Sequence, residues 1–105
     1  MLIQDNLVLT RVEPTGQGGT QFLYRVHDYG IAAVSSPNED VTLIHWKVDV
    51  IKYRDSETLQ YDAYHDTDLG EGPLKFKNDK SANEFLKKAF AYFEELNTLD
   101  GMMNK

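Results

Sequence analysis

The sequence contains no cysteine, which excludes disulfide bonds, thiol chemistry and zinc sites built on thiolates. It also lacks any apolar run near the length of about 18 residues that a membrane-spanning helix requires. The first residues carry neither a basic stretch nor a long apolar segment, unlike a signal peptide. We therefore expect a cytoplasmic protein without membrane insertion.

Catalytic and nucleotide-binding motifs are lacking as well. The glycine-rich run at residues 16–19 has no Gly-Lys-Ser/Thr ending, and a predicted strand rather than a helix follows it. No serine lies in the sequence of a nucleophile elbow. We therefore expect a protein that is not an enzyme and that has no cofactor.

The chain has 105 residues and a formal net charge of −6. This length is ordinary for one domain, so we expect a single domain over residues 1–105. A hydrophobic share of 41% with 11% aromatic residues supports a packed core. The negative charge argues against nucleic acid as a partner, because phosphate contacts need a basic surface.

Up to about residue 77, apolar residues mostly alternate with polar ones, a pattern typical of β-strands. We expect a tight turn at residues 28–30, with Gly30 available for a positive φ. The predicted strands are residues 6–12, 22–27, 31–34, 41–53, 58–65 and 74–77.

The strands predicted at residues 41–53 and 58–65 allow a prediction of how they pair with each other. If residues 54–57 are the connecting loop, Val50 lies opposite Tyr61 and Val48 opposite Ala63. The apolar residues of both strands then share one face of the sheet. A loop one residue longer would place Asp62 on the core side, so the hydrophobic pattern favours the shorter loop.

From Ser81 to Leu99 the apolar spacing changes to that of an amphipathic helix. Ser81 followed by Glu84 fits a capping box at its beginning. Gly101 stands where a left-handed residue would end the helix, and residues 102–105 are expected to fray. The apolar stripe comprises Ala82, Phe85, Leu86, Ala89, Phe90, Phe93 and Leu96, widened by Tyr92 and Leu99.

A helix with a wide aromatic stripe needs an apolar surface to cover, and the predicted sheet supplies one. We therefore predict an α+β fold: a curved antiparallel sheet or partly open barrel of five to six strands, followed by one C-terminal helix packed on it. The order of elements is similar to that of a pleckstrin-homology-like barrel, with strands first and a capping helix last. A flat meander with the helix across one face is the alternative.

The outward face of the predicted sheet is less polar than a purely solvated face should be. Tyrosine favours protein interfaces because it combines apolar area with a polar group. On the same face, His45 is expected to lie opposite Asp66. The candidate interaction surface consists of Leu43, His45, Lys47, Ile51, Tyr53, Tyr64 and Asp66.

A different possibility is an apolar pocket between the sheet and the helix. The acidic segment at residues 66–71 offers oxygen ligands but lacks the spacing of a calcium-binding loop, so we assign it no metal ion. The residues predicted to line the pocket are Trp46, Tyr61, His65, Phe90 and Phe93.

These features favour a small acidic protein-interaction module that is not an enzyme, of the adaptor, inhibitor or immunity type. Its expected partner is another protein, or a second copy of the chain that forms a homodimer through the outward sheet face. The alternative function is that of a small-molecule-binding domain that uses the predicted pocket.

Overall fold

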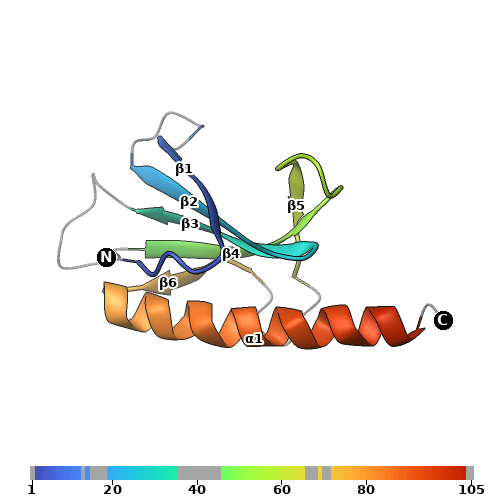
Figure 1. The fold of residues 1–105 in the computed structure, drawn as a ribbon. Helices are drawn as coiled ribbons and strands as arrows, with labels where there is room; N and C mark the ends of the chain where they lie inside the picture. The colour runs from blue at the N-terminus through green and yellow to red at the C-terminus, as the bar shows by residue number, and fades with distance from the viewer. Residues whose placement is uncertain are drawn as a thin grey trace.

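The computed structural model describes residues 2–12, 14, 19–35, 46–65, 69 and 72–103, with residues 100–103 described by their backbone alone. Within these residues, six strands form one antiparallel sheet that is not closed into a barrel, and a C-terminal helix packs on it (Figure 1). The predicted α+β fold is therefore confirmed. The strands are β1 (Leu7–Val12), β2 (Thr20–Val26), β3 (Tyr29–Ser35), β4 (Trp46–Tyr53), β5 (Tyr61–Ala63) and β6 (Leu74–Phe76), and the helix is α1 (Asp79–Met103).

The strands β1 to β4 form a meander in which each strand pairs with the next along the chain. The second edge of β4 is shared by two short strands. β6 pairs with the beginning of β4, where Trp46 lies opposite Phe76. β5 pairs with the end of β4, where Tyr53 lies opposite Tyr61. The first residues of the strand predicted at 41–53 lie outside the described residues.

The turn between β2 and β3 has only His27 and Asp28 as loop residues. His27 has a φ of 58°, which lies in the left-handed region. The prediction that Gly30 supplies the turn is therefore wrong, because Gly30 lies within β3. A Cβ atom on Gly30 would lie 2.1 Å from the backbone oxygen of Tyr24 and 2.6 Å from the ring of Tyr53, so glycine is needed there for space.

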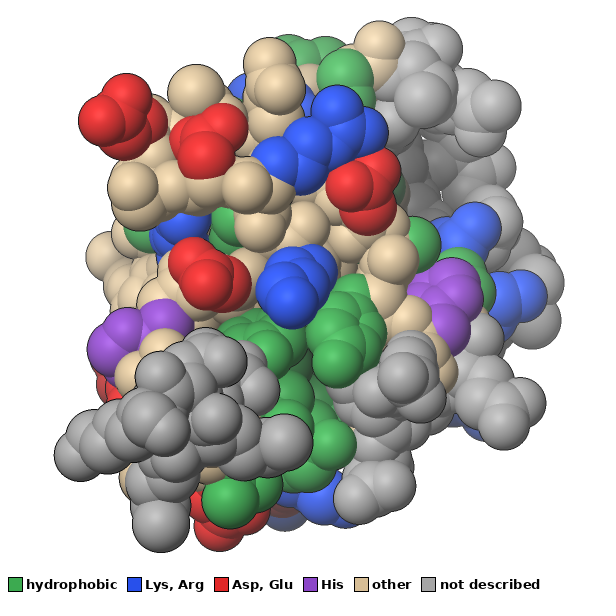
Figure 2. All heavy atoms as spheres, turned by 90° about the vertical axis from the view of Figure 1, so that its right-hand side faces the viewer, with side chains coloured by type: hydrophobic (Ala, Val, Ile, Leu, Met, Phe, Trp, Pro, Cys, Tyr) green, Lys and Arg blue, Asp and Glu red, His purple; other side chains and the backbone are tan. Residues whose placement is uncertain are grey.

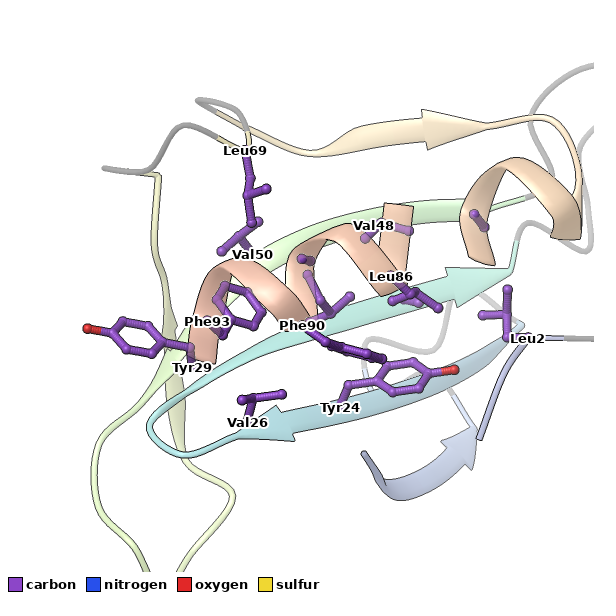
Figure 3. Close-up of a cluster of buried hydrophobic side chains, with 14 of the residues drawn as sticks. Leu2, Tyr24, Val26, Tyr29, Val48, Val50, Leu69, Leu86, Phe90 and Phe93 are labelled. Atoms are coloured by element: carbon purple, nitrogen blue, oxygen red, sulfur yellow. The ribbon is translucent and has the colours of Figure 1, made fainter. Parts of the chain in front are cut away.

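The helix α1 covers one face of the sheet with the apolar stripe that the sequence predicts, except for Leu99, which is 53% exposed. Its buried side chains Leu86, Phe90 and Phe93 point toward the sheet (Figure 3). The rings of Phe90 and Tyr24 lie 5.5 Å apart between centroids, and those of Phe93 and Tyr29 lie 5.7 Å apart. We call this group the helix-side cluster, and its buried members are Leu2, Tyr24, Val26, Tyr29, Ile31, Ala33, Trp46, Val48, Val50, Leu69, Ala82, Leu86, Ala89, Phe90 and Phe93.

The first described residues belong to the helix-side cluster. Leu2 is buried in it. The backbone N–H of Ile3 donates to the side-chain oxygen of Asn83 at 2.8 Å, and the hydroxyl of Tyr24 donates to the backbone oxygen of Ile3 at 2.7 Å. This short segment therefore joins α1 to β2.

The helix α1 begins earlier and ends later than the sequence predicts. The side-chain oxygen of Asn78 accepts the backbone N–H of Ser81 at 2.8 Å, which is the geometry of an N-cap residue. The predicted capping box at Ser81 is therefore wrong, because Ser81 lies inside the helix. The predicted end at Gly101 is also wrong, because the helix continues to Met103.

The face of the sheet away from α1 carries a smaller apolar cluster, which we call the far-side cluster. Because β3 lies between this cluster and the helix-side cluster, its residues from Tyr29 to Ala33 are all buried. The buried members of the far-side cluster are Leu23, Ala32, Ile51 and Tyr53, and Leu9, Leu59 and Tyr61 pack against them.

Candidate functional site

The hairpin of β4 and β5 has a longer loop than the hydrophobic pattern predicts. Tyr53 lies opposite Tyr61 and Lys52 opposite Asp62, which leaves residues 54–60 as the loop. The predicted register is therefore wrong. The observed register turns Tyr61 toward the far-side cluster and places Asp62 on the helix side of the sheet, the position that the shorter loop avoids.

Hydrogen bonds from two side chains hold this loop. The carboxylate of Asp55 accepts the backbone N–H of Thr58 at 2.7 Å and that of Glu57 at 2.9 Å. These bonds lower the pKa of Asp55, because they favour its charged form. The guanidinium of Arg25 donates to the backbone oxygens of Thr58 (3.0 Å) and Asp55 (2.5 Å). Together with Leu59, which packs on the far-side cluster, these contacts favour the longer loop.

The position of Asp62 on the helix side is tolerated because β5 stands away from α1 (Figure 1). The described strands that α1 contacts are β2, β3, β4 and β6. The side chain of Asp62 is 63% exposed, and its carboxylate accepts two hydrogen bonds from Arg54, at 2.9 and 2.7 Å. This two-point hydrogen bond lowers the pKa of Asp62.

The end of the hairpin forms an open cleft of about 380 Å³, which we call the end cleft. Figure 2 shows this end of the molecule, with hydrophobic side chains exposed among lysine, arginine and acidic side chains. The end cleft is lined by Lys52, Tyr53, Arg54, Asp62, Ala63 and Tyr64.

Two tyrosine rings hold the ammonium group of Lys52 beside the end cleft. The Nζ atom lies 5.4 Å from the ring centroid of Tyr29 and 5.7 Å from that of Tyr64. The ring of Tyr29 is itself stacked on Phe93 of the helix. Because the rings are anchored in the helix-side cluster, the cation has a defined position, and each such contact contributes about 0.5–1 kcal/mol at an exposed site.

Tyr64 lies on a different face of the sheet from the one predicted. Its backbone N–H donates to the backbone oxygen of Val50 at 2.8 Å, so Tyr64 lies beside Val50 on the helix side. Its half-buried side chain packs against the helix-side cluster. The prediction of Tyr64 on the outward face is therefore wrong, although its ring still lines the end cleft.

Ile51 and Tyr53 do face away from the helix as predicted, but they are buried, with exposed fractions of 1% and 3%. The hydroxyl of Tyr53 donates to the backbone oxygen of Tyr24 at 2.9 Å, and the guanidinium of Arg25 lies 4.4 Å above its ring centroid. Burial raises the pKa of Tyr53 to about 12. The expectation that Ile51 and Tyr53 form an accessible surface is therefore wrong, because the chain covers them itself.

Of the other residues in the predicted interaction surface, Lys47 is exposed on β4. Leu43, His45 and Asp66 lie outside the described residues, and so does the expected pairing of His45 with Asp66.

The residues of the predicted pocket are divided between the two faces of the sheet. Trp46, Phe90 and Phe93 are buried in the helix-side cluster, while Tyr61 packs on the far-side cluster. The indole N–H of Trp46 donates to the carboxylate of Asp79 at 2.6 Å. The sheet therefore separates the residues that were predicted to line one pocket.

His65, also predicted for that pocket, pairs instead with Asp49 of β4. Its Nε2 atom lies 2.9 Å from the carboxylate of Asp49, and both side chains are partly exposed. The other described histidine, His27, lies 3.1 Å from Glu94 of the helix. Within the described residues, no group of three histidine, aspartate or glutamate side chains could hold a metal ion.

Lys52, Arg54 and Asp62 line the end cleft but were not singled out by the sequence analysis. Charge pairing across the hairpin could have identified them. The predicted register places Asp49 opposite Asp62, and like charges in that position are destabilising. The observed register instead places Lys52 opposite Asp62.

Comparison of the chain with protein-family models, curated proteins and solved structures finds no match. Among the described residues, no helix has the length and apolar character needed to cross a membrane.

Proposed function

We propose that this chain is a non-enzymatic protein-interaction module that binds another protein at the end cleft, in the cytoplasm. One observation carries the proposal: Tyr29 and Tyr64 hold the Lys52 ammonium beside an open cleft. A fixed cation next to aromatic surface offers a partner both charge attraction and apolar contact, and tyrosine is enriched in protein interfaces for this reason.

The charges around the end cleft indicate which group of the partner binds there. The carboxylate of Asp62 already accepts two bonds from Arg54. The ion pairs among described residues do not include Lys52, so its charge is available to a carboxylate. We therefore expect the partner to present an acidic side chain beside an apolar one, with the apolar group against Tyr64.

The alternative of a small-molecule-binding domain has less support. Its predicted residues are divided by the sheet, with Trp46 and Tyr61 on opposite faces. The end cleft is within the size range of ligand sites, about 300–1,000 Å³, but it is open to solvent. Small-molecule sites usually enclose most of their ligand, which an open cleft does not do.

The proposal is tested by capture from extracts of the cells that produce the protein. The immobilised chain is compared with Lys52→Gln and with Lys87→Gln, a matched change at an exposed lysine of α1. We expect the same protein to be retained by the unchanged chain and by Lys87→Gln, and about tenfold less by Lys52→Gln, since a charged hydrogen bond contributes about 1.5–3 kcal/mol.

Circular dichroism checks that each variant is folded. Equal retention by Lys52→Gln, or no specific retention by the unchanged chain, would show that the end cleft is not a protein-binding site.

A further inference from the structure

Two lysines lie directly opposite each other on the face of the sheet away from α1. Lys47 of β4 pairs with Lys75 of β6, and both side chains are exposed. Their neighbours along the strands, Trp46, Val48 and Phe76, belong to the helix-side cluster or pack against it. Because successive side chains of a strand point to opposite faces, both lysines point away from the helix. Like charges in directly opposed positions repel each other and destabilise a sheet.

The described acidic residues closest in sequence to these lysines have other partners. Asp49, two residues from Lys47 on the same face of β4, lies 2.9 Å from the imidazole of His65. Asp79, which follows β6, accepts the indole N–H of Trp46 on the helix side. The ion pairs among described residues include neither lysine. The described part of this acidic chain therefore leaves two adjacent positive charges without a carboxylate.

The lysine pair continues a row of side chains across the sheet. Lys47 lies opposite Val34 of β3, which lies opposite Gln21 of β2, and Gln21 lies opposite Arg11 of β1. The row has a positive charge at each end and no acidic side chain. Val34 is half-buried, so an apolar surface adjoins Lys47. An anion that reaches the lysines therefore meets attraction from the pair and an apolar neighbour beside it.

We propose that Lys47 and Lys75 together bind a phosphorylated side chain of a partner protein. A phosphoryl group carries a charge of about −1.5 to −2 at pH 7 and three acceptor oxygens, which matches two ammonium groups. The Cβ atoms of directly opposed residues are about 4.5–5.5 Å apart, so both long side chains reach one compact anion. A carboxylate supplies a single charge, and two carboxylates held as close together as the lysines would repel each other.

Other sources of a phosphoryl group fit this surface less well. The two lysines stand on open strands, whereas small-molecule sites usually enclose most of their ligand. Nucleic acid presents many phosphates and needs a broad basic surface, which a chain with a net charge of −6 does not favour. A phosphorylated side chain brings one compact anion together with a protein surface that covers it. The proposal does not depend on the end cleft, because Lys52 lies on the opposite face of β4.

Binding is tested with the full chain and a short peptide in which leucines flank a phosphoserine, followed by the NMR chemical shifts of backbone amides. We expect a dissociation constant on the order of 1 mM, with the largest shifts around residues 47 and 75. The same peptide with serine or glutamate in place of phosphoserine is expected to bind at least tenfold more weakly. Inorganic phosphate is expected to bind several-fold more weakly than the phosphopeptide, because it makes no apolar contact with Val34.

Substitution of single lysines tests which groups hold the phosphoryl group. Lys47→Gln and Lys75→Gln are each expected to weaken binding of the phosphopeptide about tenfold. Lys87→Gln, at an exposed lysine of α1, is the matched control and is expected to leave the affinity unchanged. A measurement without ligand accompanies these: since Lys75→Gln removes one of two opposed like charges, its urea midpoint should exceed that of Lys87→Gln.

Each measurement has an outcome that contradicts the proposal. Equal affinity of the unchanged chain and Lys75→Gln for the phosphopeptide, or equal affinity for the phosphoserine and glutamate peptides, would overturn it. A urea midpoint of Lys75→Gln no higher than that of Lys87→Gln would show that the two ammonium groups are not held close together, which the proposal requires. Inorganic phosphate that binds as tightly as the phosphopeptide would overturn the assignment to a partner protein.

Discussion

Gly30 shows how the absence of a side chain leaves room for a tyrosine ring in the far-side cluster. The ring of Tyr53, from β4, lies against Gly30, and its hydroxyl reaches the backbone oxygen of Tyr24 on β2. A Cβ atom at Gly30 would occupy the space that this ring uses. The far-side cluster therefore depends on a glycine whose backbone conformation is ordinary for a strand.

We expect Gly30→Ala to destabilise the protein by about 2–3 kcal/mol, because overpacking forces neighbouring atoms to move and the nearest atom is backbone. Gly72→Ala is the matched control: nothing lies within 4 Å of a Cβ atom there, so its effect should stay within about 0.5 kcal/mol. Urea unfolding followed by circular dichroism measures both. Similar losses of stability in the two variants would contradict this account of Gly30.

Single residues were predicted well where the pattern was strong and local. Phe90 and Phe93 were expected to face the sheet, and both are buried against it. The role of Gly30 could not be predicted, because it depends on a ring that comes from another strand. A turn was the natural interpretation of a glycine beside Asp28, and only the register of β2 on β3 shows that the turn ends before it.

Among the elements, the helix was predicted correctly from the spacing of its apolar residues, but its first and last residues were predicted wrongly. Asn78 and Ser81 are both good N-cap residues, so composition alone does not choose between them. The choice depends on where the chain leaves β6, which is fixed by its pairing with β4. That pairing is a contact between distant parts of the sequence, and no local pattern reports it.

Replacing the two candidate caps tests the beginning of α1. Asn78→Ala removes the hydrogen bond to the N–H of Ser81 and is expected to cost about 1 kcal/mol of unfolding free energy. Ser81→Ala keeps that bond, because only the backbone of Ser81 takes part in it, and is expected to cost a few tenths of a kcal/mol at most. Thermal and urea unfolding give both values. A larger loss of stability for Ser81→Ala than for Asn78→Ala would support the predicted capping box at Ser81.

The register predicted for the β4–β5 hairpin is wrong for a physical reason. The prediction assumed that the sheet has one apolar face, so that Tyr61 had to share a face with Val50. The sheet has apolar clusters on both faces, and Tyr61 belongs with Tyr53 on the far side. Hydrophobic alternation cannot distinguish the two faces of such a sheet. The hydrogen bonds of Asp55 within the loop favour the longer loop, and the alternation of apolar residues does not reveal them.

The end cleft follows from this register. Tyr53 and Tyr64 were expected at a functional surface, and both line the cleft. Lys52 and Asp62 come together only when they are opposite each other, as observed. Residue type therefore drew attention to two residues that line the cleft but not to their positions, because Tyr53 is buried and Tyr64 lies on the helix side.

For the whole molecule, stability depends on two clusters that are each anchored by a buried tyrosine. Tyr24 belongs to the helix-side cluster and Tyr53 to the far-side cluster. Burial raises the pKa of each phenol to about 12, against an ordinary value of 10.0. Because burial disfavours the phenolate, the folded state keeps these protons at a pH where the unfolded chain loses them.

The sign of the pH dependence follows from linkage. Below pH 10 both states hold the protons, so the stability from these tyrosines is complete. As the pH rises from 10 to about 12, the unfolded state releases protons that the folded state keeps, and the free energy of unfolding falls. Urea unfolding at several pH values is expected to show this decrease.

Tyr53→Phe separates the contribution of one group. At pH 7 the variant should be less stable by about 1 kcal/mol, because the hydrogen bond to Tyr24 is lost. The difference from the unchanged chain should narrow above pH 10, because phenylalanine has no proton to lose. A difference that stays constant up to pH 12 would show that the Tyr53 phenol does not contribute to the alkaline loss.

The contact between Ile3 and Asn83 spans 80 positions of the chain, and it bears on how the protein folds during synthesis. A ribosome releases the chain from its N-terminal side, at about 5–20 residues per second. The sheet-side members of the helix-side cluster, with Leu2 among them, therefore leave the ribosome seconds before the helix that covers them. Until α1 emerges, the helix does not cover the apolar residues of the sheet, and apolar surface exposed in this way is prone to aggregation.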